Sequence, residues 1–330
     1  MPHVALIVPG DVETRTGGYI YDKRMAEGLR AHGWTVDIRQ PDLAALGDGT
    51  IALVDGLALL ALGDTVARHA RRLRIVLLIH LPLSLEVGLG PAEAARRDAL
   101  ERRAMPCARM AIATGRSTAD LLAARGARVA LVEPGTDPAP VARGSIGDGV
   151  ALVSVAALTI GKGHEALLTA LAAVPSRGWS LTCAGSVDRD PATAARTRST
   201  AETLGLGGRV TFAGELDDRT LAALYDRSDA FVCASLRETY GMAIAEAIAR
   251  ALPVVTTDVG AARQIVGAGG IVVRPDAPSE FVDALTRVIT DPDLRARLRD
   301  GAGTARERLT TWEQASRTMA DALAAVETDG

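Results

Sequence analysis

The stretch that decides the fold of this chain is SLRETYGMAIAE, residues 235–246. An apolar run before it, residues 230–234, predicts a buried strand, and the alanine- and isoleucine-rich run after Gly241 predicts a helix. In a strand–turn–helix unit the first backbone N–H groups of the helix, here from about Tyr240 to Ala243, point to the carboxyl edge of a sheet. Such a helix start favours a negatively charged group, phosphate above all.

Two carboxylates accompany this helix start. Glu238 lies in the polar turn and Glu246 lies one to two helical turns later, so both side chains can face the same crevice. Carboxylates do not bind phosphate, but they accept hydrogen bonds from paired hydroxyls such as those of a sugar or a ribose. Two solvated glutamates on an ordinary helix would be the alternative, and it leaves the turn, the spacing and the following apolar strand unexplained.

The segment resembles the E-x7-E signature of retaining glycosyltransferases of the family 4 type, which have the GT-B fold. The resemblance continues through LPVVTTDVG, residues 252–260. It implies an α/β protein with two Rossmann-like, parallel-sheet domains that face a cleft. It also implies that Glu246 binds the ribose of a nucleotide-sugar donor and that Glu238 binds the hydroxyls of its sugar. Four residues of the helix start are then donor-binding: Thr239, Tyr240, Gly241 and Met242.

Composition indicates the type of core and argues against nucleic-acid-binding and cysteine-based metal or redox functions. The 330 residues suffice for two domains, and 48% hydrophobic with only 3% aromatic residues predicts an aliphatic core of the kind found in parallel sheets. The 37 basic and 40 acidic side chains nearly cancel, so a nucleic-acid partner is not expected. Three cysteines, far apart in apolar runs, show no metal or redox spacing. With no transmembrane run and no signal peptide expected, the prediction is a cytoplasmic protein.

Short apolar runs alternate with helical patterns along the whole chain, which predicts parallel strands joined by crossover helices. The Pro- and Gly-rich stretch from Pro134 to Gly149 reads as a linker, so we expect an acceptor-side domain at 1–145 and a donor-binding domain at 146–311. The resemblance implies that a last helix, about 312–328, crosses back to the first domain. Strands are expected near 4–8, 35–39, 51–54, 75–80, 110–113, 128–132, 151–155, 180–184, 209–213, 230–234, 253–257 and 270–273, and first-domain helices near 19–31, 92–104 and 117–124.

Lys162 is one of only two lysines among the 37 basic residues. It follows a predicted strand and precedes Gly163, so it lies at the first strand–helix turn of the second domain, where an ammonium group can reach a diphosphate. The resemblance implies this role, since relatives carry a lysine followed by glycine here. Relatives often carry an arginine five residues earlier, where this chain has Ala157. Arg15 and Arg237 are the candidates for the missing cation.

Two features of the first domain also belong to the expected site. Gly17 and Gly18 form a turn before a predicted helix, and adjacent glycines let the backbone approach a ligand closely. His80 ends an apolar strand, and ligands of open α/β sheets bind at that end of the strands. A structural histidine is the alternative for His80. The resemblance implies that the glycines lie by the donor phosphate and acceptor, and that His80 contacts the donor sugar.

Arginines are frequent in the first domain, including Arg96, Arg97, Arg102 and Arg103. They are interleaved with acidic residues, which favours a salt-bridged, solvated face. The alternative is a surface that meets an anionic acceptor or lipid. Because no aromatic anchors accompany these arginines, peripheral membrane contact has little support.

The sequence therefore predicts a retaining enzyme that moves a sugar from a nucleoside-diphosphate sugar to a hydroxyl acceptor. Glu238, His80 and Lys162 are the expected catalytic residues. No cofactor is expected, and no metal, because the nearest match to an acidic D-x-D cluster, Asp188–Asp190, reads as a loop. A nucleotide-sugar epimerase or hydrolase and a non-catalytic nucleotide-sugar-binding subunit remain as alternatives. The sequence carries no code for the base, the sugar, the acceptor or the oligomeric state.

Overall fold

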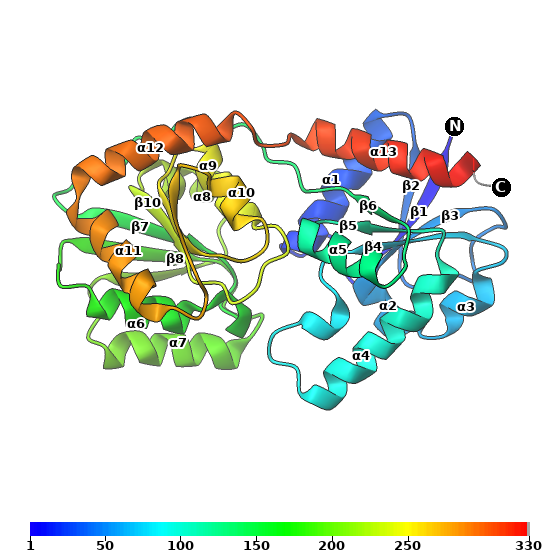
Figure 1. Ribbon diagram of the computed structural model, residues 1–330, viewed down its shortest axis with the longest axis horizontal. Coiled ribbons are helices and arrows are strands. Elements are labelled where there is room, and N and C mark those ends of the chain that lie inside the picture. Colours follow the sequence, from blue (N-terminus) through cyan, green and yellow to red (C-terminus); the bar gives the residue numbers. More distant parts are fainter. Residues whose placement is uncertain (329–330) are drawn as a thin grey trace. The chain divides into compact units, whose positions relative to one another are not determined.

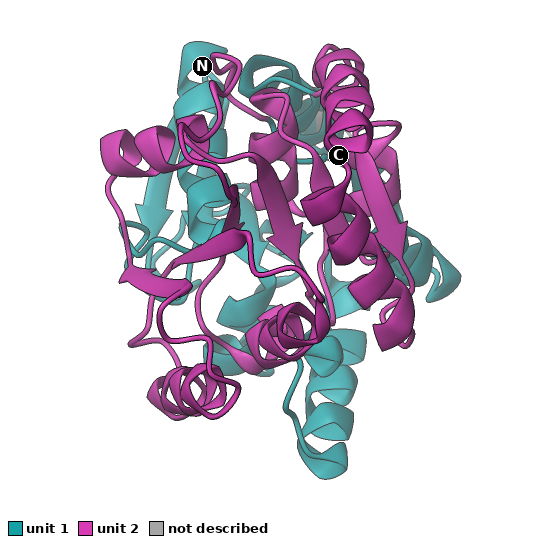
Figure 2. Ribbon diagram, turned by 90° about the vertical axis from the view of Figure 1, so that its left-hand side faces the viewer, with its two compact units in different colours: residues 1–135, 310–330 teal, residues 136–309 magenta. Residues whose placement is uncertain are grey.

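The computed structural model describes residues 1–328, which form two compact units (Figure 2). Unit 1 contains residues 1–135 together with the chain from Thr310 onward, and unit 2 contains residues 136–309. Each unit is built on one six-stranded sheet in which all the paired strands run parallel. The prediction of two parallel-sheet domains of the α/β class is confirmed.

In unit 1 the strand order is β2-β1-β3-β4-β5-β6. The strands are β1 (His3–Ile7), β2 (Thr35–Arg39), β3 (Ile51–Asp55), β4 (Arg74–Ile79), β5 (Met110–Ala113) and β6 (Val129–Leu131). The helices are α1 (Gly17–Ala31), α2 (Leu59–Leu62), α3 (Thr65–His69), α4 (Pro91–Ala104), α5 (Arg116–Ala124) and α13 (Trp312–Thr328). Three short 3-10 turns, η1 (Gly56–Ala58), η2 (Leu83–Leu85) and η3 (Met105–Cys107), complete the unit.

The unit 1 sheet is covered on both faces, as the continuous apolar runs of its strands require. Along β1 the side chains alternate between the two faces. Ala5 and Ile7 join the core that contains residues of α2, α4 and α5, whereas Val4 and Leu6 join the core that contains residues of α1 and α13. Aliphatic residues supply nearly all of this packing, so the low aromatic content of the sequence reflects the layered architecture.

Helix α13 packs along α1, although nearly three hundred residues separate them (Figure 1). Gly28 on α1 makes the close approach possible, because a Cβ at that position would lie 2.3 Å from the Cβ of Ser316. At the start of α13 the indole of Trp312 lies edge-on to the ring of Tyr21, with centroids 6.2 Å apart. The hydroxyl of Tyr21 donates a hydrogen bond to Val132 O at 2.9 Å, which ties α1 to the end of β6.

In unit 2 the strand order is β12-β11-β10-β7-β8-β9. The strands are β7 (Val150–Val155), β8 (Trp179–Ala184), β9 (Val210–Gly214), β10 (Ala230–Cys233), β11 (Val254–Thr257) and β12 (Gly270–Val273). The helices are α6 (His164–Ala173), α7 (Pro191–Thr203), α8 (Asp218–Asp226), α9 (Met242–Ala249), α10 (Ala262–Val266), α11 (Pro278–Thr290) and α12 (Pro292–Arg306). One 3-10 turn, η4 (Ile160–Lys162), precedes α6. Because β7 occupies the centre of the order, between β10 and β8, the turns after these three strands are neighbours.

The chain passes between the units at Gly135 and again after Leu309. Residues 136–145, which the sequence assigned to the first domain, lie with unit 2 because their backbone is bonded to it. Ala142 N donates to Arg250 O at 2.9 Å, and Gly144 N donates to Asp226 O at 2.9 Å. Within residues 1–328, no helix combines the length and the apolarity that crossing a bilayer would require.

Candidate functional site

The carboxyl ends of two neighbouring strands bring Lys162 and Glu238 together in unit 2. Lys162 closes the turn η4 after β7, and Glu238 lies in the turn after β10. Lys162 Nζ donates a hydrogen bond to Glu238 Oε1 at 2.6 Å, and Ser235 Oγ donates to the same oxygen at 2.8 Å. Because 76 residues separate the two partners, their contact depends on the pairing of β7 with β10.

Two backbone contacts hold these turns against each other. Leu236 N donates to Gly161 O at 2.8 Å. Gly163 has a φ of 66°, and a Cβ there would lie 2.1 Å from Ala234 O. Only glycine combines this left-handed backbone with such a close approach. The glycine that follows Lys162 is therefore required for η4 to reach the end of β10.

The Lys162–Glu238 pair is partly shielded from solvent, with side-chain exposures of 32% and 16%. Burial lowers the pKa of Lys162, but the charge of Glu238 and the hydrogen bond to it raise that pKa above its usual value. The ammonium group is thus charged at neutral pH, and its charge is balanced by the carboxylate. An anionic ligand that binds Lys162 has to compete with Glu238 for it.

Helix α9 starts beside this pair, and Gly241 is its N-cap. The first intrahelical bond runs from Ala245 N to Gly241 O at 3.0 Å, so the N–H groups of Met242 and the next two residues lie ahead of the ladder. Of the range expected from the sequence, about Tyr240 to Ala243, Met242 and Ala243 belong to the first turn of α9, and Tyr240 precedes the N-cap. Tyr240 is buried in the core of unit 2, and its carbonyl accepts a hydrogen bond from Ala261 N. Thr239 belongs to the turn.

Glu246 lies within α9 and is held by a residue of α8. Its Oε2 accepts a hydrogen bond from the hydroxyl of Tyr225 at 3.1 Å. Burial raises the pKa of Glu246, whereas Tyr225 and Arg250 oppose that rise. The ring of Tyr225 is fixed between Phe231, at 6.5 Å between centroids, and the guanidinium of Arg250, at 4.5 Å from the ring centroid. The Glu246 carboxylate is therefore held in position by the fixed ring of Tyr225.

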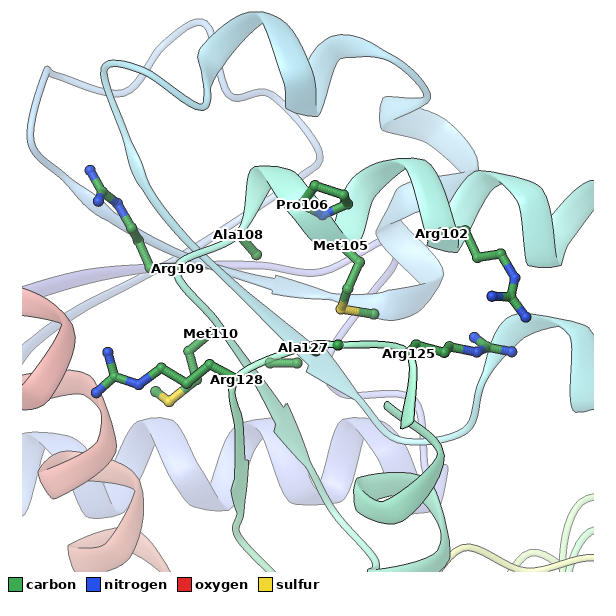
Figure 3. Close-up of a pocket in the computed structure, with 11 residues that line it drawn as sticks. Arg102, Met105, Pro106, Ala108, Arg109, Met110, Arg125, Ala127 and Arg128 are labelled. Atoms are coloured by element: carbon green, nitrogen blue, oxygen red, sulfur yellow. The ribbon is translucent and has the colours of Figure 1, made fainter. Parts of the chain in front are cut away.

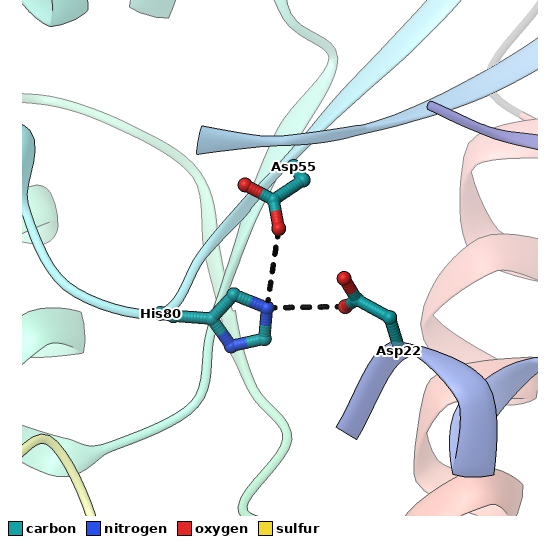
Figure 4. A group of neighbouring side chains, drawn as sticks. All are labelled: Asp22, Asp55 and His80. Carbon is teal, nitrogen blue, oxygen red and sulfur yellow. Dashed lines mark hydrogen bonds and ion pairs between the residues drawn. The ribbon is translucent and has the colours of Figure 1, made fainter. Parts of the chain in front are cut away.

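In unit 1, His80 follows β4 and faces two aspartates (Figure 4). His80 Nε2 lies 3.0 Å from Asp22 Oδ1 and 3.6 Å from Asp55 Oδ2. Asp22 comes from α1 and Asp55 ends β3, and both side chains are almost fully buried. The turn at the start of α1 covers the imidazole, because a Cβ on Gly18 would lie 3.5 Å from His80 Cδ2. Gly17 is the first residue of the same helix.

The imidazole of His80 thus interacts with the carboxyl groups of both Asp22 and Asp55. Burial raises the pKa of Asp55 to about 7, against the opposing charge of His80 and with the help of Asp22. Burial lowers the pKa of His80, but Asp22 and then Asp55 raise it above its usual value. Among residues 1–328, Asp22 Oδ2 is a buried oxygen without a hydrogen-bond partner. The three side chains therefore hold an excess of acceptors over donors.

Asp22, Asp55 and His80 could also hold a metal ion, since one ligand atom from each lies within 4.8 Å of the others. Two carboxylates and an imidazole form a donor set that suits a divalent transition metal. Sequence reasoning missed both aspartates because 33 residues separate them and neither belongs to a short motif. The available signal was their position. Asp55 ends an apolar strand as His80 does, and Asp22 lies one helical turn after Gly18.

Four arginines of unit 1 line a separate cavity. This cavity of about 350 Å³ lies where β5 and β6 begin, at the amino edge of the sheet (Figure 3). Its lining includes Met105, Met110, Arg102, Arg109, Arg125 and Arg128. On the adjoining helix α4, Glu93 bonds to Arg96 and Arg97, and Asp98 bonds to Arg102. The interleaved charges of the 93–102 segment are therefore ion-paired, as their spacing predicted.

Comparison with known proteins finds that the second half of the chain is similar to a described family. Residues 141–304, nearly all of them in unit 2, match the family model "Glycosyl transferases group 1". A D-inositol 3-phosphate glycosyltransferase of Corynebacterium glutamicum is 30% identical over 220 residues, which cover 62% of this chain and 52% of that protein. The chain spans about half the length, or less, of the curated relatives it matches first.

Solved structures extend the likeness to the whole fold. Sucrose-phosphate synthase from Thermosynechococcus elongatus has a TM-score of 0.86 at 20% identity, with both chains fully covered. Anabaena Alr3699/HepE, solved in complex with UDP and glucose, has a TM-score of 0.79 at 18% identity, over 98% of this chain and 100% of that one. At these identities the likeness concerns the fold, which is GT-B.

Proposed function

We propose that this protein is a retaining glycosyltransferase that moves a sugar from a nucleoside-diphosphate donor to a hydroxyl group of an acceptor. The observation that carries the proposal is the contact of Lys162 with Glu238 beside the first N–H groups of α9. A cation and a helix start suit a diphosphate, and a carboxylate suits sugar hydroxyls. Their position within a group 1 glycosyltransferase domain supports the same activity.

The proposed roles follow from charge. As the bond between the sugar and the diphosphate breaks, negative charge grows on the leaving oxygen. In this proposal Lys162 and the N–H groups near Met242 stabilise that charge by electrostatic preorganisation. Glu238 accepts hydrogen bonds from the donor sugar, and Glu246 accepts them from the ribose. The acceptor oxygen forms the new bond on the face that the diphosphate leaves, and its proton passes to the departing phosphate oxygen.

Other parts of the expected site belong to the same proposal. His80 contacts the donor sugar, and Gly17 and Gly18 approach the donor phosphate and the acceptor. No metal is required for transfer in this scheme, because Lys162 and the start of α9 supply the positive potential that a metal would otherwise provide. Asp22 and Asp55 then act on His80 alone, by orienting its imidazole.

The comparisons suggest where to look for substrates. The Anabaena structure contains UDP and glucose, and several relatives are named as D-inositol 3-phosphate glycosyltransferases. UDP-glucose and D-inositol 3-phosphate are therefore the first donor and acceptor to test, followed by other nucleotide sugars and simple glycosides.

The test is product analysis with and without acceptor. The protein is incubated with each nucleotide sugar, and the released nucleoside diphosphate and every sugar-containing product are quantified. A glycosyltransferase forms a glycoside that depends on the acceptor. Free sugar or an isomerised donor formed without acceptor would indicate a hydrolase or an epimerase. Tight donor binding without any product from a broad acceptor panel would indicate a non-catalytic binding subunit, and either result would overturn the proposal.

A further inference from the structure

The turn after β7, where the diphosphate is proposed to bind, contains one basic side chain. From Ala156 to Gly163, the segment that leads from β7 to α6, Lys162 is the only charged residue. Its ammonium group is balanced by Glu238 at 2.6 Å. A diphosphate carries several negative charges, and anionic ligands of this kind are usually held by more than one cation or by a bidentate guanidinium. A second cation is therefore expected within reach of the same turn.

The loop after β8 is pressed against this turn. Ala156 N donates to Ala184 O and Leu158 N donates to Ser186 O, each at 2.9 Å. Gly185 lies between them, and a Cβ at that position would be 2.1 Å from Ala156 O and 2.7 Å from Ala157 N. Gly185 and Ser186 thus lie beside the backbone of Ala156 to Leu158, and the loop leads on from there to Arg189.

Arg189 is the basic residue of this loop. Its side chain is exposed, and among residues 1–328 no hydrogen bond or ion pair involves its guanidinium. The neighbouring carboxylate of Asp190 is occupied elsewhere, because it caps α7 through the N–H and the hydroxyl of Thr193 at 3.0 and 2.6 Å. Asp188 is exposed, and its N–H is bonded to Ser186 Oγ. After burial and the effects of Glu238 and Cys233, the charge of Arg189 also acts on the pKa of Lys162, which it lowers.

We propose that Arg189 is the second cation of the diphosphate site, reaching from the β8–α7 loop over Ala157 to the donor's phosphates. The proposal rests on the proposed function and adds to it a binding residue outside the expected motif. The guanidinium donates paired N–H bonds to phosphate oxygens. The guanidinium of Arg189 thereby provides the positive charge that the side chain of Ala157 lacks.

The test compares two exposed arginines of the same region by calorimetry with UDP, GDP and ADP and with the matching monophosphates. Arg189→Ala should weaken binding of the preferred diphosphate by about tenfold, because a charged hydrogen-bonding partner is lost. The monophosphate, which lacks the outer phosphate, should lose much less. Arg198→Ala is the matched control, since Arg198 is an exposed arginine of α7, outside the loop. Arg189→Lys should retain part of the affinity.

A rescue experiment makes the assignment specific. Ala157→Arg in the Arg189→Ala background should restore diphosphate affinity, because it places a guanidinium at the same turn. Equal affinities of Arg189→Ala and wild type for the diphosphate would overturn the inference while leaving the proposed function intact. So would a loss caused instead by Arg237→Ala or Arg15→Ala. If the wild-type protein binds none of the diphosphates, the proposed function fails and this inference fails with it.

Discussion

Lys162 Nζ lies 2.6 Å from Glu238 Oε1, so the cation assigned to the diphosphate is paired with the carboxylate assigned to the donor sugar. The carboxylate of Glu238 raises the pKa of Lys162, and the hydrogen bond between them fixes the position of both side chains. In the proposed scheme, the phosphate of a bound donor attracts the ammonium group, and the sugar hydroxyls donate hydrogen bonds to the carboxylate. The free energy needed to separate the pair is thereby offset by two new sets of contacts, and a nucleoside diphosphate without sugar offers only one of them.

Lys162→Ala should reduce turnover more than donor affinity, because the charge that Lys162 stabilises grows only as the glycosidic bond breaks. The loss in kcat should be on the order of 100-fold. Lys23→Ala is the matched control: Lys23 is the other lysine of the chain and is paired on the surface of unit 1 with Glu13 at 2.7 Å. Activity of Lys162→Ala within a few fold of wild type would show that another cation holds the leaving group.

Glu246→Ala should weaken binding of the nucleotide itself. The carboxylate is proposed to accept two ribose hydroxyl bonds, and bonds to charged groups contribute roughly 1.5–3 kcal/mol each. The dissociation constant of the preferred nucleoside diphosphate, measured by calorimetry, reports the effect. Glu202→Ala, which removes an exposed carboxylate from α7, is the control. An unchanged constant for Glu246→Ala would remove Glu246 from the site.

The reaction should preserve the anomeric configuration of the donor and should proceed in excess chelator. Attack from the side of the departing phosphate gives retention, and Lys162 with the start of α9 replaces a metal. Proton NMR of the first product, formed in the presence of chelator, reads both properties from one sample. An inverted anomeric coupling would contradict the mechanism. Activity abolished by the chelator and restored by Mn²⁺ would contradict the metal-free scheme and would direct attention to Asp22, Asp55 and His80.

Stability should fall as the pH drops because His164 is buried without hydrogen-bond partners on either ring nitrogen among residues 1–328. Burial, with the charge of Lys162, lowers the pKa of His164 from 6.5 to about 4. Between these two pH values His164 is therefore protonated in the unfolded chain and neutral in the folded protein. Above pH 6.5 His164 is neutral in both states and does not reduce the free energy of unfolding. As the pH falls toward 4, only the unfolded chain is protonated at His164, and the free energy of unfolding decreases by up to roughly 3 kcal/mol.

His164→Leu isolates that effect, because every other titrating group is shared with wild type. Urea unfolding at a series of pH values should show the free energy of unfolding of wild type falling relative to that of His164→Leu as the pH drops from 6.5 toward 4. Parallel curves over this interval would mean that His164 finds a partner, such as an ordered water, that keeps its protonation the same in both states.

Gly28→Ala should destabilise unit 1, since its methyl group would overlap the Ser316 side chain and force α13 away from α1. Overpacking of this kind commonly costs about 1–3 kcal/mol. Gly303→Ala serves as the opposite case: no heavy atom lies within 4 Å of the added Cβ in α12, so a gain of about 0.5–1 kcal/mol is expected. Thermal unfolding of the two variants measures both, and similar shifts would contradict the role given to the α1–α13 contact.

The strands were predictable from the sequence because each is a short apolar run, and residues 230–246 already specified a strand, a turn and a helix. The neighbourhood of Lys162 and Glu238 followed from placing both at the carboxyl ends of strands, a position that a one-dimensional pattern can indicate. Their direct pairing did not follow, since it depends on which strands are adjacent in the sheet.

Tertiary contacts account for what the sequence did not show. Tyr225 carries no sign that its hydroxyl meets Glu246, because α8 and α9 come together only through the packing of the unit 2 core. Asp22 and Asp55 likewise read as a helix residue and a strand-end residue until the fold places both at His80. The proposed role of Arg189 in diphosphate binding depends on the close approach of Gly185 to Ala156. No residue spacing in the sequence predicts that approach.

The way the chain passes between its units has a consequence for its synthesis. Unit 2 is one continuous segment, whereas unit 1 needs residues from both sides of that segment. During synthesis on the ribosome, the core of unit 2 can form before α13 has been made. At that stage α1 still lacks the helix that packs against it. Until then the apolar face around Met25 and Leu29 remains open to water, and to chaperones. Unit 1 is therefore begun before unit 2 and completed after it. Truncation near residue 310 should remove α13 from unit 1 and leave all of unit 2.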